Sequence, residues 1–345
     1  FLWLAISCGH FSFVQWFFVH ERVWFFGVIP GIQSLGLLSL TSAQRFLSES
    51  KQKRFIRNVF NQYVSPEVID RLITDPGNLK LGGEQRELTA FFTDLAGFTT
   101  FSEQMTAEAQ VSLLNEYLGE MTDILLKHDG TLDKYDGDAI KAFFGAPVYF
   151  ENHAEQACLV GIEMQQRLGE LRDKWKKQGL PELKMRIGIN TGMMVVGNLG
   201  SHTRMSYGMN GDAVNLAARL EGANKFYSTY SMISESTYLQ SHPIIEAREL
   251  DRIQVVGRKN AVTIYELLGP KGCLSPEQQK VITHYQNGLD GYKSGQWDEA
   301  IDYFNKALAL DPEDGPSTVL MNRCLEMKQT SPAGQWDGVY TLSSK

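Results

Sequence analysis

The chain opens with two apolar stretches that are separated by a short charged segment. Residues 1–19 contain no Asp, Glu, Lys or Arg, and residues 23–44 are again uncharged after His20-Glu21-Arg22. Each stretch is about 20 residues long, which is the length of a helix that crosses a bilayer. Aromatic side chains crowd the first stretch, as in interfacial belts. The pattern predicts two transmembrane helices over 1–44. A buried helical hairpin in a soluble core is the alternative, whereas a signal peptide would need a basic start.

The segment after the second apolar stretch is basic and then amphipathic. Its positive charges come from Arg45, Lys51, Lys53, Arg54 and Arg57. By the positive-inside rule this flank and everything after it are cytoplasmic, which predicts a multi-pass protein of the cell (inner) membrane. Apolar residues then recur at helical spacing, so residues 45–80 are predicted to form a cytoplasmic amphipathic linker helix that can pair with its own copy.

Strand and helix patterns alternate over residues 81–269, which we interpret as one domain. Helical periodicity predicts three long helices, over 107–128, 153–178 and 212–224. β-branched and aromatic runs predict strands over 88–93, 131–135, 139–144, 184–191, 193–197, 231–234, 248–256 and 262–267. Here 184–191 and 193–197 are expected to pair with each other. Long helices interleaved with hairpins favour an α+β sandwich, with helices on one side of one sheet.

The pattern changes once more over residues 270–328. Apolar residues between Tyr285 and Pro312 fall at the spacing of a tetratricopeptide helix pair, and a third helix is predicted over 316–328. One such pair cannot bury its own apolar face, so we expect this small all-α unit to dock on the preceding domain or on a second protomer. A protein partner is a further expectation for this unit. Residues 329–345 are predicted to form an extended tail that Trp336 anchors.

Composition excludes some classes of protein but does not indicate a reaction. The length of 345 residues allows two or three domains, and the net charge of -7 lacks the basic footprint of nucleic-acid binding, so no nucleic-acid partner is expected. The four cysteines lie far apart, without the paired spacing of a zinc site or a disulfide framework. The chain starts at Phe1 and not at methionine, so we expect a fragment of a longer protein whose N-terminal sensory region precedes it.

Two aspartates are the first candidates for chemistry. Asp94 ends the strand predicted over 88–93, where a buried carboxylate is costly unless a cation pairs with it. A role as a turn or helix cap is the alternative. Asp138 lies in the tight turn between two short strands, and both carboxylates meet at one sheet edge if those strands lie beside 88–93. Two carboxylates suit Mg²⁺ or Mn²⁺ and not zinc, and a two-metal site serves phosphoryl transfer.

Four ordered segments make the chain resemble a known family, the class III adenylyl and guanylyl (nucleotidyl) cyclases. They are residues 91–101, 132–138, 186–192 and 211–221. Residues 60–66 resemble the entry to such a catalytic domain, and the tetratricopeptide-like segment resembles that of bacterial membrane-anchored cyclases. The resemblance implies a ferredoxin-like, palm-type α+β sheet. It also implies attack of the nucleotide 3′-hydroxyl on its own α-phosphate, which yields a 3′,5′-cyclic nucleotide and pyrophosphate.

The resemblance assigns the metal and catalytic residues. Asp94, Asp138 and the Leu95 carbonyl would bind two Mg²⁺ or Mn²⁺ ions per active site. Asn215 would orient the ribose, and Arg219 would stabilise the pentavalent transition state. An arginine offers a fixed fork of donors to developing phosphate charge, and residues four apart share a helix face.

The resemblance also assigns substrate-binding residues, with two departures from the family. Lys134 stands where adenylyl cyclases place the lysine that recognises adenine. Its usual partner is Asp or Thr seven residues before Asn215, but this chain has Gly208 there. Arg258 or Lys259 would replace the usual lysine for the triphosphate. The turn after the metal aspartate supplies the remaining candidates, Gly97, Phe98 and Thr99.

The sequence therefore predicts a membrane-anchored adenylate cyclase that converts ATP into cyclic AMP. In this family the metal aspartates come from one protomer, and Lys134, Asn215 and Arg219 from the other. One chain carries both sets, so we expect a head-to-tail homodimer with two composite sites. Gly208 leaves a guanylate or relaxed-specificity cyclase as an alternative. A catalytically silent dimerisation or scaffold module is the alternative of another class.

Overall fold

The computed structural model describes residues 2–22, 36–37, 39–44, 82–98, 105–201, 204–254, 261–330, 336 and 338–341. The chain divides into two compact units, Phe1–Asp70 and Arg71–Lys345, which we describe separately.

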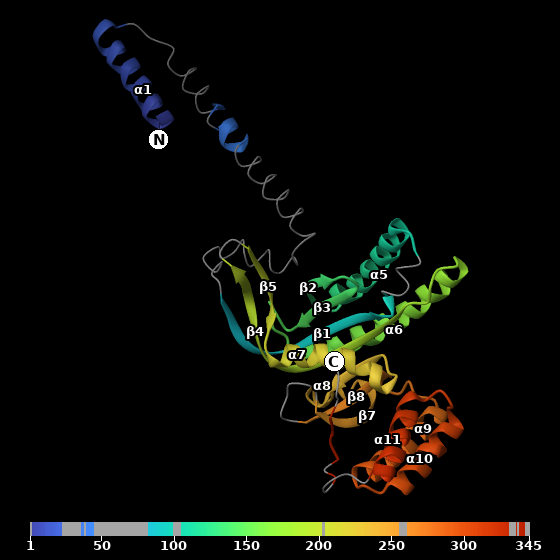
Figure 1. Ribbon diagram of the computed structural model, residues 1–345. Helices are drawn as coiled ribbons and strands as arrows, with labels where there is room; N and C mark the ends of the chain where they lie inside the picture. Colours follow the sequence, from blue (N-terminus) through green and yellow to red (C-terminus); the bar gives the residue numbers. More distant parts are fainter. Residues whose placement is uncertain are drawn as a thin grey trace. The chain divides into compact units, whose positions relative to one another are not determined.

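The described part of the first unit is mainly helix α1, Leu2–Glu21 (blue in Figure 1). No helix among the residues described here is both long and apolar enough to cross a membrane. With 20 residues α1 is long enough to cross a bilayer, but it is not apolar enough. The prediction of transmembrane helices over 1–44 is contradicted, and with it the multi-pass membrane localisation. Most of residues 23–44, and all of the linker helix predicted over 45–80, lie outside the described residues.

The second unit is built on a sheet of nine described strands. Their order is β2-β3-β1-β4-β6-β8-β7-β9, and β5 pairs with β4. The bounds are β1 Gly82–Ala96, β2 Thr131–Asp136, β3 Ala139–Phe144, β4 Lys184–Ser201, β5 Arg204–Asn210, β6 Ser231–Ser234, β7 Ile245–Gln254, β8 Val262–Pro270 and β9 Tyr340–Thr341. The expected strands therefore form, and β3 pairs with β1 as the active-site prediction requires.

The hairpin predicted within 184–197 is wrong. β4 continues through Thr191 and Gly192 without a turn, because β1 pairs with it on both sides of this point, from Ala96↔Lys184 to Gly82↔Asn198. The antiparallel partner of the far end of β4 is β5, with Val195 opposite Asn210. Thr191-Gly192 resembles a turn signal in the sequence, but paired backbone on the neighbouring strand keeps it extended.

Helices cover both faces of the sheet, not one side as expected. Helices α5, Ala107–Lys127, and α6, His153–Lys177, pack on the face that carries Phe91. Helix α7, Asp212–Tyr227, packs on the opposite face near Leu88 and Ala90. It approaches β4 so closely that a Cβ on Gly188 would lie 2.2 Å from the Ala217 carbonyl oxygen. A short helix that the sequence did not predict, α8 (Glu235–Ser241), follows β6.

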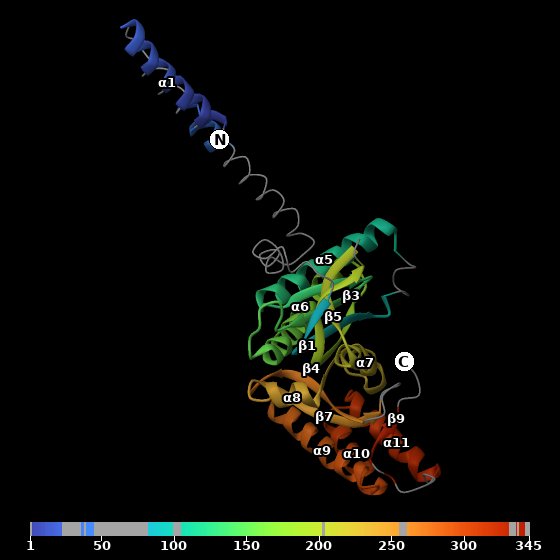
Figure 2. The same ribbon diagram turned by 90° about the vertical axis from the view of Figure 1, so that its left-hand side faces the viewer.

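Three helices form the C-terminal part of the second unit, which we call the C-terminal helical unit. They are α9 Pro276–Lys293, α10 Trp297–Leu310 and α11 Gly315–Thr330. Figures 1 and 2 show them grouped beside β7, in orange and red. Their buried side chains share one cluster with those of α7, β7 and β8, so the helix pair docks on the preceding domain. Trp336 anchors the tail by packing on Tyr292 and Trp297.

Candidate active site

The structure brings Asp94 and Asp138 together at one edge of the sheet. Asp94 lies near the end of β1, and the pairing of Thr93 with Ile140 places the β2–β3 turn beside it. The Leu95 N–H donates to Asp138 Oδ2 over 3.1 Å. The turn uses Gly137 with φ +65°, a left-handed conformation that glycine adopts readily. Asp94 and Asp138, which are 44 positions apart in the sequence (138 − 94), are thus brought close together.

The charges around Asp94 leave room for a cation. Burial raises the pKa of Asp94, the neighbouring Asp138 raises it further, and Arg186 and the Leu95 N–H oppose the rise. Two close, half-buried carboxylates repel each other, and a cation between them removes that cost. Among the described residues no three His, Cys, Asp or Glu side chains form a metal cluster. A metal here would therefore take two carboxylates, with backbone, water or substrate oxygens completing its shell. These hard oxygen donors fit Mg²⁺ or Mn²⁺.

Glu221 is the residue near the carboxylate pair that sequence reasoning missed. Burial, with Asp94 and Asp138 nearby, raises the pKa of Glu221 to about 7, while Arg186 lowers it. The sequence assigned no role to Glu221 beyond its place in the motif segment 211–221. The spacing holds a usable signal, because Glu221 follows Ala217 by one helical turn and both approach Gly188 of β4.

Asn215 and Arg219 lie one turn apart on α7. Asn215 is exposed, and Arg219 is half-buried. The buried Nη1 atom of Arg219 has no hydrogen-bond partner in the described part of the chain. A guanidinium nitrogen without a partner is available to an anionic oxygen. The charged groups that shift the pKa of Asp94 are Asp138 and Arg186, and Arg219 is not one of them.

Lys134 and Gly208 lie on two strands that approach each other, β2 and β5. The residue between them is Asp133, which the sequence did not single out. A Cβ on Gly208 would lie 2.6 Å from Asp133 Oδ1, so this carboxylate occupies the space in which a side chain at 208 would begin. Burial raises the pKa of Asp133, while Lys134 and Lys141 oppose the rise. Asp133 lies where the register between β2 and β3 shifts, an irregularity that local sequence does not reveal.

The other predicted site residues are less informative. Gly97 is exposed and has φ +73°, whereas the Phe98 side chain is buried in the core beneath α5 and α6. Phe98 therefore packs in the protein interior and does not present its ring at the surface. Thr99, Arg258 and Lys259 lie outside the described residues.

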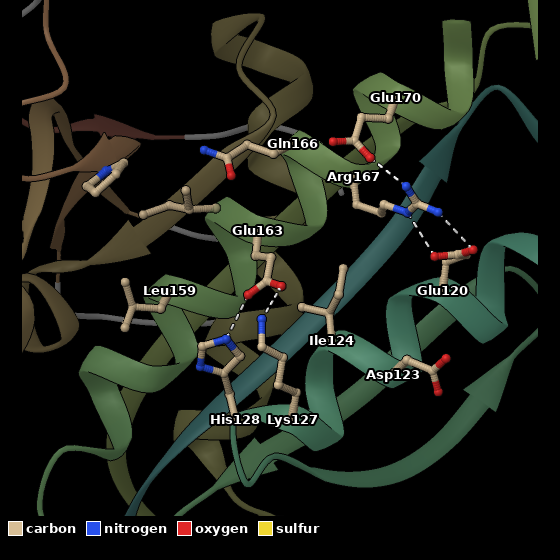
Figure 3. A pocket seen from close by; sticks show the side chains of 12 residues that line it. Glu120, Asp123, Ile124, Lys127, His128, Leu159, Glu163, Gln166, Arg167 and Glu170 are labelled. Atoms are coloured by element: carbon tan, nitrogen blue, oxygen red, sulfur yellow. Dashed lines mark hydrogen bonds and ion pairs between the residues drawn. The ribbon is translucent and has the colours of Figure 1, made fainter. Parts of the chain in front are cut away.

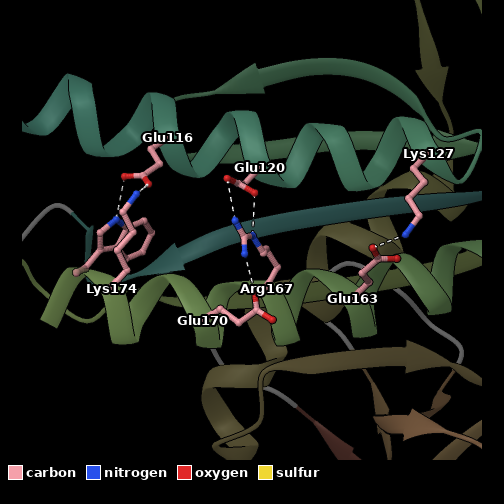
Figure 4. A network of polar contacts seen from close by, with 8 residues as sticks. Glu116, Glu120, Lys127, Glu163, Arg167, Glu170 and Lys174 are labelled. Atoms are coloured by element: carbon pink, nitrogen blue, oxygen red, sulfur yellow. Dashed lines mark hydrogen bonds and ion pairs between the residues drawn. The ribbon is translucent and has the colours of Figure 1, made fainter. Parts of the chain in front are cut away.

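A pocket between α5 and α6 contains none of the predicted site residues (Figure 3). Most of its charged side chains pair with each other. Lys127 and His128 contact Glu163 (Figure 3), and Arg167 contacts Glu120 (Figure 4). We therefore regard this α5–α6 seam as a solvated junction between two helices.

The chain matches two family models. The model described as "Adenylate and Guanylate cyclase catalytic domain" matches residues 83–269, which is more than half of the chain. The model described as "Tetratricopeptide repeat" matches residues 282–314.

Curated relatives and solved structures include cyclases of both nucleotides. Adenylate cyclase 1 of Rhizobium meliloti is 38% identical over 213 residues, 61% of this chain and 32% of the relative. Adenylate cyclase of Anabaena cylindrica is 33% identical over 62% of this chain and 42% of the relative. The chain thus spans less than half the length of these relatives.

Among solved structures, the adenylyl cyclase CyaB from P. aeruginosa has 41% identity and a TM-score of 0.53 over 56% of this chain and 100% of that chain. A guanylyl cyclase has 38% identity and a TM-score of 0.51 over 56% of this chain and 98% of that chain.

Proposed function

Because this chain belongs to the adenylate and guanylate cyclase catalytic domain family, we propose that it converts ATP into 3′,5′-cyclic AMP and pyrophosphate. The observation that carries the proposal is the meeting of Asp94 and Asp138 at the end of β1. A scaffold would have no use for two close, half-buried carboxylates, because their repulsion only destabilises the fold when no cation is bound.

The reaction exchanges one phosphorus–oxygen bond for another. The ribose 3′-oxygen forms a bond to the α-phosphorus and loses its proton to solvent, and the bond from the α-phosphorus to the β-phosphate oxygen breaks. Asp94, Asp138 and the Leu95 carbonyl would hold two divalent cations, which would supply activation of the attacking oxygen and neutralisation of phosphate charge. Asn215 orients the ribose. Arg219 donates its otherwise unpartnered nitrogen to the charge that develops on the α-phosphate.

We propose that two copies of the chain assemble head to tail and share their active sites. Within one chain Arg219 does not contribute to the electrostatics of Asp94, and Asn215 is exposed on the helix surface. The carboxylates of one protomer would then face Asn215, Arg219 and Lys134 of the other. Such an arrangement gives two equivalent sites per dimer.

We propose that Lys134 and Asp133 together recognise adenine. Lys134 donates to a ring nitrogen, and the Asp133 carboxylate accepts from the exocyclic amine. Asp133 would thereby do the work of the side chain that Gly208 lacks, since its carboxylate already borders that position. Guanine offers N–H groups to a carboxylate as well, and one similar structure is a guanylyl cyclase. A guanylate or relaxed-specificity cyclase is therefore the second candidate.

The test is a nucleotide assay with matched variants. Purified protein is incubated with ATP or GTP and Mn²⁺, and the cyclic product is quantified. We expect cyclic AMP as the main product and a loss of at least about 100-fold for Asp94→Ala. The control is Asp136→Ala, an exposed aspartate in the same turn that pairs with Lys141; it should keep most of the activity. Cyclic GMP as the main product would overturn the base assignment, and no product with either nucleotide would favour the scaffold.

A further inference from the structure

Helix α7 is held between two parts of the protein. One face approaches β4 at Gly188. A second face lies in the core of the C-terminal helical unit: Leu216, Leu220, Ala223 and Tyr227 recur every three or four positions and form one buried stripe. The residues of the C-terminal helical unit in the same cluster include Tyr285, Leu289, Tyr292, Phe304, Leu320 and Cys324. Asn215 and Arg219 directly precede two residues of this stripe, so a shift of the helical unit moves them too.

A buried polar cluster fastens the end of α7 to α11. Tyr227 donates its hydroxyl proton to Asp251 Oδ2 over 2.6 Å, and Arg323 of α11 donates to the same oxygen over 2.7 Å. Arg323 Nη1 also donates to the Tyr227 hydroxyl over 3.0 Å, and its guanidinium lies over the Tyr227 ring at 4.7 Å. Asp251 is fully buried. These hydrogen bonds join α7, β7 and α11, and a displacement of any one of the three would break at least one of them.

The start of α11 presses directly on the end of α7. A Cβ on Gly315 would lie 2.5 Å from the Ser228 Cβ. Ser228 itself caps α7 in the left-handed conformation, with φ +55°. The helix therefore cannot slide towards its C-terminus without meeting α11.

We propose that the C-terminal helical unit is part of the active-site scaffold, and that Arg323 is the positioning residue through which it fixes α7 and hence Asn215 and Arg219. The proposal rests on the roles assigned above to those two side chains. Arg219 precedes Tyr227 by about two helical turns, roughly 12 Å along the axis. A displacement of about 1 Å at reacting groups costs on the order of 100-fold in rate. A small shift at the contacts of Arg323 with Tyr227 and Asp251, which we call the Arg323 clamp, should therefore change the rate measurably.

Arg248 provides a matched control. It is as buried as Arg323, with side-chain exposures of 7% and 8%. It also joins the sheet to the C-terminal helical unit, through Glu266 and Asp314, and its guanidinium lies over the Tyr285 ring. None of these partners belongs to α7. A general loosening of the junction should therefore affect both arginines alike, whereas a positioning role should distinguish them.

The experiment compares Arg323→Lys with Arg248→Lys in the full 345-residue chain. Steady-state kinetics with ATP and Mn²⁺ give kcat and KM, and hydrogen–deuterium exchange of the 212–227 segment reports on α7 directly. We expect Arg323→Lys to lower kcat about 10- to 100-fold, with KM changed less than about threefold, and to raise exchange across 212–227. Arg248→Lys should leave both quantities close to those of the unchanged protein.

Tyr227→Phe keeps the ring beneath the guanidinium and removes only the hydroxyl. It is a milder change at the same site, so it provides a test if Arg323→Lys fails to fold. We expect a smaller change of the same kind. Equal loss of kcat in the two arginine variants, or unchanged exchange in Arg323→Lys, would overturn the proposal. Hydrogen exchange can be measured without catalytic turnover. If the unchanged protein were inactive, the cyclase assignment would be overturned. Faster exchange over 212–227 in its Arg323→Lys variant would still support the Arg323 clamp.

Discussion

Two regions of this protein are rich in ion pairs, and they differ in their access to water. In the α5–α6 seam, Arg167 and Glu120 keep 38% and 36% of their side-chain surface exposed. At the junction between the sheet and the C-terminal helical unit, Arg323 keeps 8% and Asp251 none. Residue types and distances are similar in the two places. Burial, and not the number of pairs, therefore determines how strongly an ion pair restricts the arrangement of the elements that it joins.

The physical reason is the hydration that each charged group keeps or loses when the protein folds. An exposed pair exchanges water for a partner of similar strength and contributes about 0–1 kcal/mol. A buried pair has lost its water, so removing one partner strands the other and costs about 3–5 kcal/mol. The seam can therefore tolerate sequence change, whereas the junction holds one geometry.

The largest expected effect comes from Asp251→Asn. Arg323 then remains buried without an anionic partner, and the free energy of unfolding should fall by about 3–5 kcal/mol. Urea unfolding measures the change. The control is Asp298→Asn, which breaks the exposed pair with Lys328 and should cost less than about 1 kcal/mol. Similar losses in the two variants would contradict the comparison.

Asp314→Asn should have an intermediate effect. Arg248 keeps Glu266 as a second carboxylate, so its charge is not stranded. The amide oxygen can still accept from the Ser317 N–H at the start of α11. We expect a loss of about 1–2 kcal/mol, close to the worth of one charged hydrogen bond. A loss as large as that of Asp251→Asn would mean that a second carboxylate gives Arg248 no protection.

Glu120→Gln should have a small effect on stability. It removes the charge that Arg167 pairs with across the seam, and Glu170 remains as a second partner. We expect less than about 1 kcal/mol, and nothing measurable in about 1 M salt because exposed charges are then screened. A loss that persists in high salt would show that the seam behaves as a buried site.

The smallest effect is in the pH dependence of the seam. Hydrogen bonds from Lys174, Arg167 and Lys127 hold the pKa values of Glu116, Glu120 and Glu163 below their ordinary 4.5. A carboxyl with a lowered pKa in the folded state stabilises the protein above its unfolded pKa, and this contribution disappears as the pH falls through the folded value. The stability difference between the unchanged protein and a variant with all three replaced by Gln should be fully present at pH 7 and should shrink as the pH falls below 4.5 and through the lowered folded-state pKa values. A difference independent of pH would exclude this account.

The local pattern of apolar and polar residues predicted much of the fold, because the spacing of core positions is set within each helix or strand. The helices over 107–128 and 153–178, and the strands on either side of Asp138, follow from spacing and turn chemistry, and the structure confirms them. The prediction of transmembrane helices failed for a related reason. The absence of charged residues was taken as evidence of an apolar helix, but α1 is not apolar enough to cross a membrane.

The rest depends on contacts between distant segments, which no window of sequence contains. Glu221 matters because β4 brings Arg186 opposite Asp94 and because Gly188 lets α7 come close. Asp133 matters because β5 bends towards β2. The positions of Asp94 and Asp138 were predictable, since each ends or joins a strand. Their environment was not, because burial is a property of the assembled fold.

The Arg323 clamp also affects the order in which parts of the protein are stabilised during synthesis. Ribosomes deliver a chain from its N-terminus at about 5–20 residues per second, and roughly a hundred residues separate Tyr227 from Arg323. Tyr227, at the end of α7, is therefore synthesised about 5–20 seconds before Arg323, the residue that fastens it. Until Arg323 is synthesised, Asp251 lacks its cationic partner, and the apolar stripe of α7 has no complete C-terminal helical unit to pack on. Chaperones that hold exposed apolar helices would meet this protein at that stage of synthesis.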